Sequence, residues 1–331
     1  MDDGVAQLAS VIAAHFGEWP ESIDTLLFGT SDPGAIAREI DRFCRDELGG
    51  RVARTLFHEA SQGSVTAVEL GDGRRVVVKA HRPDEDLARL HELVRVQMHL
   101  ASRGRYATTV CGGPAPLGRG LGIVEALVEE GVTRDGHEAT VRAALARGLH
   151  AIVVACRPLV AGSTLGRHYL ADLPAHGLWP AQQAEEFAAR AAGADFIDEV
   201  ARAARARMAP AGELVIGHGD WRVQHVRFAG DRIVAAFDWA GLCREWEPAL
   251  VGFTAFAFCI DWTRTPLPTS TIDDARGFVA DYEAARGRAF SSDERRLCGA
   301  VFAYSYATMA RWVEGTFRAV VASHGPSLME L

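Results

Sequence analysis

The stretch His218-Gly219-Asp220-Trp221-Arg222-Val223-Gln224-His225 places a histidine, a glycine and an aspartate in immediate succession. A second aspartate follows in Phe237-Asp238-Trp239. The apolar runs 214–216 and 233–237 have the length and composition of short β-strands, and they bracket the polar loop. The sequence therefore predicts two carboxylates, Asp220 and Asp238, presented at the ends of strands.

Two carboxylates in this arrangement suit phosphoryl transfer. That reaction needs one carboxylate to orient and deprotonate an acceptor hydroxyl, and another to hold Mg²⁺ against the phosphate oxygens. Asp220 is our candidate for the catalytic base and Asp238 for the metal ligand.

A small antiparallel sheet is predicted upstream. Strand-like runs occupy residues 55–58, 65–70 and 75–79, and Gly71-Asp72-Gly73 predicts a hairpin turn between the last two. The third run ends in Lys79, where a kinase places the lysine that binds nucleotide phosphates. Gly63 and Ser64, between the first two runs, offer backbone and hydroxyl donors for the same phosphates.

A helix predicted over 84–103 supplies the carboxylate that would orient Lys79. Glu92 lies in the middle of this helix and is our preferred candidate. Glu85 is less suitable because acidic residues are common in the first turn of any helix. Gln97 is a possible neutral partner.

The rest of the chain is mainly helical, and the fold class expected is α+β. Residues 1–50 predict short amphipathic helices, and Pro114 and Pro116 lead into one more strand over 121–128. Further helices are predicted over 137–156, 181–208, 247–259, 272–286 and 293–323. We expect a helical segment (1–50), a nucleotide-binding sheet lobe (51–130) and a helical lobe (131–331) with the catalytic loop and acceptor site.

Composition and charge limit which classes of partner and which cellular location we expect. The net charge of −8, from 35 basic and 43 acidic residues, opposes a nucleic-acid backbone. The six cysteines form no Cys-x-x-Cys pair, so we expect reduced, buried thiols. The acidic N-terminus and the short apolar run 249–260 predict neither a secretory signal nor a membrane span. A cytoplasmic protein is expected, and the sequence does not determine its oligomeric state.

Taken in order, these residues resemble the aminoglycoside phosphotransferase/choline kinase family over residues 61–258. The resemblance implies a protein-kinase-like fold with two lobes and ATP-dependent phosphorylation of a small-molecule hydroxyl. It also implies that Asp220 is the base, Asp238 a metal ligand and Lys79 a phosphate ligand. The adenine hinge would lie within residues 125–128, with Glu125 and Leu127 as candidates. An aminoglycoside-like antibiotic or a related metabolite is the favoured acceptor.

His225 departs from the family pattern, which has asparagine at this position as a metal ligand. Mg²⁺ prefers oxygen ligands, so an imidazole points to Mn²⁺ or to an intervening water. We therefore expect ATP with Mg²⁺ or Mn²⁺ as cofactors, with Asp238 and His225 as metal ligands. A nucleotide-binding pseudokinase that acts as a scaffold is the alternative.

Overall fold

The computed structural model describes residues 3–18, 22–168, 177–180, 183–190 and 192–331. The chain forms two compact units. Unit 1 comprises Met1–Ser102 and Ala107–Glu129, and unit 2 comprises Arg103–Tyr106 and Glu130–Leu331. Each unit is described by itself.

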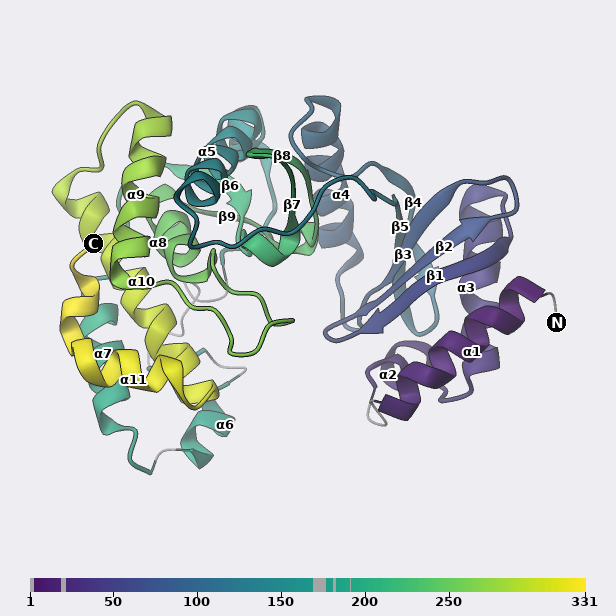
Figure 1. The fold of residues 1–331 in the computed structure, drawn as a ribbon, viewed down its shortest axis with the longest axis horizontal. Helices are drawn as coiled ribbons and strands as arrows, with labels where there is room; N and C mark the ends of the chain where they lie inside the picture. Colours follow the sequence, from purple (N-terminus) through teal and green to yellow (C-terminus); the bar gives the residue numbers. More distant parts are fainter. Residues whose placement is uncertain (1–2, 19–21, 169–176, 181–182, 191) are drawn as a thin grey trace. The chain divides into compact units, whose positions relative to one another are not determined.

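Unit 1 is an antiparallel sheet accompanied by helices (Figure 1). The strands are β1 (Val52–Ala60), β2 (Ser64–Leu70), β3 (Arg75–Ala80), β4 (Val110–Leu117) and β5 (Gly120–Ala126), in the order β1-β2-β3-β5-β4. The helices are α1 (Asp3–Glu18), α2 (Asp24–Phe28), α3 (Pro33–Leu48) and α4 (Leu87–Ser102). Helix α1 packs against β1 and α3, and apolar side chains from α1, α2, α3 and the sheet form one core.

The predicted strands and hairpin of unit 1 are confirmed, but the sequence reasoning missed β4. Pro114 and Pro116 are residues of this strand and do not merely precede one. Proline lacks the N–H that a central strand needs, and β4 tolerates it because it lies at the edge of the sheet.

Unit 2 is mainly helical and, in its described residues, contains two small two-stranded antiparallel sheets (Figure 1). The α-helices are α5 (Ala139–Cys156), α6 (Ala184–Ala189), α7 (Asp195–Arg205), α8 (Glu247–Ala257), α9 (Ile272–Arg286), α10 (Ser292–Trp312) and α11 (Thr316–His324). The short 3₁₀ helices are η1 (Arg157–Gly162), η2 (Val223–His225), η3 (Trp239–Gly241) and η4 (Gly325–Met329). Strand β6 (Leu214–His218) pairs with β9 (Leu242–Trp246), and β7 (Val226–Ala229) pairs with β8 (Arg232–Ala236).

Two predicted helices of unit 2 are each divided in the structure. The helix expected over 181–208 is replaced, among the described residues, by α6 and α7, with Gly193 between them at φ 69°. The helix expected over 293–323 is divided into α10 and α11 by Gly315 at φ 93°. Glycine adopts a positive φ without steric cost, so the chain can change direction at these residues between the helices, which periodicity alone does not predict.

One helical stretch, Ala139–Gly162, is long and apolar enough to cross a membrane by length and composition. Half of its most apolar window is buried inside the structure, and α5 packs against α9 and β6. A core helix passes the same test of length and composition, and these contacts agree with that role. The six cysteines are all free and five are buried as expected, whereas Cys111 is exposed.

Candidate active site

The turn that follows β6 carries Asp220, and close packing explains the glycine before it. A Cβ atom on Gly219 would lie 2.7 Å from His168 Cδ2, 2.9 Å from the Gly241 carbonyl oxygen and 3.0 Å from Cys243 Sγ. The Gly219 amide also donates to that Gly241 carbonyl at 2.8 Å. A larger residue would therefore displace the turn.

The His218 side chain links the backbone segment that carries Asp220 to the one that carries Asp238. Its Nδ1 accepts the Asp220 amide at 3.1 Å, so its Nε2 carries the proton and donates to the Phe237 carbonyl at 2.9 Å. Burial lowers the pKa of His218 to about 4, with the nearby His225 contributing, so the ring stays neutral at pH 7. The neutral state matters because a protonated ring has no acceptor for the Asp220 amide.

Asp220, Arg222 and His225 lie together around the turn. The Asp220 carboxylate is 3.2 Å from an Arg222 Nη atom and 3.5 Å from His225 Nδ1. His225 Nδ1 donates to the Asp220 carbonyl at 3.0 Å, so Nε2 holds the lone pair and accepts from Arg222 at 3.1 and 3.3 Å. The geometry thus gives His225 the tautomer that a ligand of a cation requires.

Asp238 completes this group from the end of β8. Its Oδ2 lies 3.7 Å from His225 Nε2. Its backbone is left-handed, at φ 58° and ψ 47°, a conformation that aspartate tolerates better than most residues with a Cβ atom. Such backbone geometry recurs at functional sites, where the surroundings hold it in place.

These residues also fit a divalent cation. One ligand atom from each of Asp220, His225 and Asp238 lies within 4.8 Å of the others. Two carboxylates and one imidazole form a donor set suited to Mn²⁺, and the two carboxylates alone suit Mg²⁺. The Arg222 guanidinium already lies against Asp220 and His225, so these atoms attract positive charge.

The environment makes Asp220 a stronger base than an ordinary aspartate. Burial raises the pKa of its carboxyl group, Arg222 opposes the rise, and the charge of Asp238 adds to it. A carboxylate with a raised pKa accepts a proton more readily, which is the property a general base needs.

Lys79 lies in unit 1, and its side chain pairs with Glu125 of β5 at 2.9 Å. Glu125 is buried, and it accepts further hydrogen bonds from Gln97 at 3.1 Å and Thr108 at 2.9 Å. Glu92, the partner expected from the sequence, forms a two-pronged pair with Arg95 at 2.7 and 2.8 Å.

The remaining predicted nucleotide ligands lie on or beside the same sheet. Gly63 is in the β1–β2 turn, where a Cβ atom would approach the Ala80 carbonyl oxygen to 2.7 Å. Ser64 begins β2 and is buried. Leu127 follows β5, and its amide donates to the Arg75 carbonyl at 3.0 Å. The nucleotide roles of these residues stay predictions.

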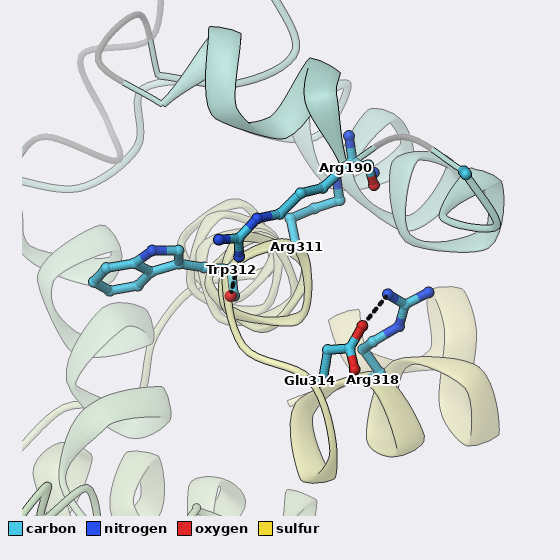
Figure 2. A pocket seen from close by; sticks show the side chains of 6 residues that line it. Arg190, Arg311, Trp312, Glu314 and Arg318 are labelled. Atoms are coloured by element: carbon cyan, nitrogen blue, oxygen red, sulfur yellow. Dashed lines mark hydrogen bonds and ion pairs between the residues drawn. The ribbon is translucent and has the colours of Figure 1, made fainter.

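A cavity of about 380 Å³ lies elsewhere in unit 2 (Figure 2). Its lining residues are Arg190, Ala192, Arg311, Trp312, Glu314 and Arg318, which include none of the predicted site residues. Arg190 donates to the Trp312 carbonyl at 2.8 Å, and Arg318 pairs with Glu314 at 3.8 Å.

Sequence reasoning missed two contributors to these arrangements. Arg222 stands in the quoted loop, where the motif assigns it no role. Thr108 lies outside any motif, so nothing in the sequence connects it with Glu125. The predicted residues fall into two groups, with Asp220, His225 and Asp238 together in unit 2 and Lys79 with Glu125 in unit 1.

The chain combines an antiparallel sheet unit with a helical unit, and the helical unit carries two aspartates on adjoining turns. This combination is typical of kinase-like phosphotransferases. The chain belongs to the phosphotransferase enzyme family, whose model matches residues 55–288. It is a small-molecule phosphotransferase of that family. No curated protein matches the sequence.

Solved structures of other phosphotransferases share the fold. The macrolide 2'-phosphotransferase of Brachybacterium faecium is 16% identical, with a TM-score of 0.52, and the match covers 88% of this chain and 95% of that one. The choline kinase of Cryptosporidium parvum is 13% identical, with a TM-score of 0.52 and coverage of 88% and 94%. An amicoumacin kinase in complex with AMP-PNP, Ca²⁺ and its antibiotic is 10% identical, with a TM-score of 0.54 and coverage of 83% and 88%.

Proposed function

We propose that the protein transfers the γ-phosphate of ATP to a hydroxyl group of a small molecule. The observation that carries this proposal is the convergence of Asp220, His225 and Asp238, with one ligand atom from each within 4.8 Å of the others. The chain also belongs to a family of phosphotransferases, and a structure with the same fold holds an ATP analogue.

In the proposed reaction Asp220 orients the acceptor hydroxyl and takes its proton. The hydroxyl oxygen then attacks the γ-phosphorus, the bond from that phosphorus to the bridging oxygen breaks, and ADP leaves. The raised pKa of Asp220 supports its assignment as the base. Asp238 and His225 would hold the divalent cation, which neutralises charge on the nucleotide phosphates when bound.

Lys79 is the proposed ligand of the nucleotide phosphates. Its pairing with buried Glu125 fixes the direction of the ammonium group. Gly63 and Ser64 would add donors from the β1–β2 turn, and the chain around Leu127 would border the adenine. In this proposal Glu92 acts on Lys79 only after it leaves Arg95.

The acceptor is proposed to be a polyhydroxylated, cationic molecule such as an aminoglycoside-like antibiotic or a related metabolite. The net charge of −8 favours approach of a cation, and two structures with the same fold are antibiotic phosphotransferases by name. A cytoplasmic location, where ATP is available, fits this reaction.

The test is ATP consumption by the purified protein against a panel of hydroxyl-bearing antibiotics and metabolites. At least one acceptor should give ADP together with a phosphorylated product. Asp220→Asn, which keeps the shape of the side chain and removes the base, should lower that rate by about 10²–10⁴-fold. Nucleotide binding without a phosphorylated product across the panel would instead support a pseudokinase scaffold.

A further inference from the structure

Three side chains of unit 1 that have no part in the proposed reaction converge inside it. His15 comes from α1, Asp24 begins α2, and His58 lies on β1. One ligand atom from each residue lies within 4.8 Å of the others, and we call these three residues the His15 cluster. The cluster brings together three elements that are separate in sequence.

The hydrogen bonds of the cluster leave two buried polar atoms unpaired. The side chains of Asp24 and His58 are completely buried. Asp24 Oδ2 accepts from His58 Nε2 at 3.0 Å and from Ser22 Oγ at 2.8 Å; the Ser64 side chain is also near this carboxylate, but Oδ1 has no partner within hydrogen-bond geometry. His15 Nε2 is also buried without a partner.

Two buried polar atoms without hydrogen-bond partners in one cluster favour a ligand that contacts both of them. More than about nine in ten buried polar groups in proteins are hydrogen-bonded, and an exception often marks an ion or water. Here an imidazole nitrogen and a carboxylate oxygen, both electron-pair donors, are left over in one cluster. A cation satisfies both atoms at once, and so does a water molecule that donates two hydrogen bonds; the convergence of three potential ligand atoms favours the cation.

We propose that the His15 cluster is a binding site for a divalent transition metal ion, with zinc as the expected ion. The donors are two imidazole nitrogens and one carboxylate oxygen. Zinc accepts such a set readily, while Mg²⁺ and Ca²⁺ require sites made of oxygen. Water completes the coordination, as it does in other zinc sites with three protein ligands.

The groups that would support the ligands are already in position. His58 Nδ1 is 2.9 Å from Thr66 Oγ1, and Ser22 Oγ donates to the Asp24 carboxylate. Zinc-bound histidines usually donate their second N–H to an oxygen, and such contacts fix the ring and its tautomer. On metal binding, the single N–H proton of the neutral His58 ring moves from Nε2 to Nδ1, so Nε2 becomes a ligand and Nδ1–H donates to Thr66 Oγ1.

The coordination distances require only a small contraction of the cluster. Zinc bonds of about 2.0–2.1 Å in a tetrahedron place ligand atoms about 3.3 Å apart, against the 4.8 Å within which they lie here. Rotation of the His15 side chain, which is partly exposed, closes this difference and gives the ion an entry path. The bound ion would tie α1 and α2 to β1 and so stabilise the N-terminal helices on the sheet.

The experiment measures zinc bound by the full-length protein after removal of metal. His15→Gln removes one ligand and leaves the buried Asp24–His58 pair intact, so this variant should fold. It should bind one zinc fewer per chain than the wild type, and zinc should raise its melting temperature less. Zinc at Asp220, His225 and Asp238 is present in both proteins and cancels in the comparison.

The matched control is His137→Gln. His137, Cys259 and Asp274 form another His-containing cluster of the same kind, but the buried side-chain nitrogen and oxygen atoms without a partner in the described residues include none from this cluster. His137→Gln should leave the zinc-dependent rise in melting temperature unchanged. Cobalt(II) gives a second readout, because binding at the His15 cluster produces no thiolate-to-cobalt charge-transfer band, whereas a Cys259 site would.

Equal zinc content in wild type and His15→Gln overturns the proposal and leaves the cluster a hydrogen-bond network with a buried water. If His15→Gln is not folded by circular dichroism, Thr66→Val decides the question. Loss of this supporting contact should weaken zinc binding about 10–100-fold, and an unchanged affinity overturns the proposal.

Discussion

Two buried histidines hold the turn on which the proposed base lies. His218 joins the Asp220 amide to the carbonyl that precedes Asp238, and His168 Nε2 contacts the Gly219 carbonyl at 3.1 Å. Burial lowers the pKa of both rings to about 4, so both are neutral under physiological conditions. At the level of single residues, the position of Asp220 therefore depends on imidazoles that do not take part in the proposed chemistry.

The pKa of His168 predicts a loss of stability on mild acidification. Because the folded-state pKa is about 4 and that of the unfolded chain about 6.5, the unfolded state binds more protons between these values. Stability is therefore complete above pH 6.5 and falls as the pH drops towards 4, by about 2 kcal/mol at pH 5 for this one group.

His168→Gln is the variant that checks this prediction, because glutamine keeps a donor for the Gly219 carbonyl and does not titrate. Denaturant unfolding at pH 7 and pH 5 should show a smaller loss in His168→Gln than in the wild type. Identical losses in the two proteins would show that His168 is not buried as a neutral ring.

At the level of elements, close packing around Gly219 predicts a large effect from a single methyl group. Gly219→Ala would drive a Cβ atom against three neighbours within 3.0 Å, so the free energy of unfolding should fall by about 1–3 kcal/mol. Gly166→Ala is the control, since nothing lies within 4 Å of the added atom, and it should change stability by less than about 0.5 kcal/mol. Equal thermal unfolding curves for the two variants would contradict this explanation.

The sequence predicts an element well where a local sequence pattern determines it, and poorly where pairing with a distant segment determines it. The α9 boundaries match the expected 272–286 because Thr271 and Asp274 form a capping box at its start and Gly287 ends it. Strand β9 was missed because Leu242–Trp246 contains two charged residues and becomes a strand by pairing with β6. Strand β4 was missed because its prolines are acceptable only at an edge, which is a property of the whole sheet.

The same difference between local patterns and distant pairing explains which residues of the site could be predicted. Asp220, His225 and Asp238 lie close in sequence on turns that the flanking strands identify. The pairing of Lys79 with Glu125 depends on the register of β3 against β5, in which Val77 lies opposite Glu125. Lys79 is two residues beyond Val77 on the same face, so the two charges are diagonal neighbours. This register joins distant segments and has no signature in the local sequence.

For the whole molecule, we predict that substitutions in the two units change different kinetic parameters. Asp220→Asn should lower kcat by about 10²–10⁴-fold while the KM for ATP stays within a few-fold, because Asp220 acts on the acceptor. The double variant Lys79→Met/Glu125→Gln should instead raise the KM for ATP. Both charges are removed together because either one left alone would be buried without its partner.

Steady-state kinetics with varied ATP, using an acceptor found in the screen, measures both effects. A double variant with an unchanged KM for ATP would remove Lys79 from the nucleotide site, and an Asp220→Asn protein with wild-type kcat would remove Asp220 from the reaction.

One segment, Leu214–Trp246, runs from the start of β6 to the end of β9. It contains the turn with Asp220, the contacts of Arg222 and His225, and the left-handed Asp238. Because this segment pairs with itself through β6–β9 and β7–β8, its geometry is specified largely by neighbours in the chain. The contacts from outside the segment are fewer and include His168 at the Gly219 carbonyl and the Leu145 carbonyl that accepts from Trp221 Nε1. Under the proposed function, an exchange of one acceptor for another would then require substitutions outside residues 214–246, while the two carboxylates within that segment are kept.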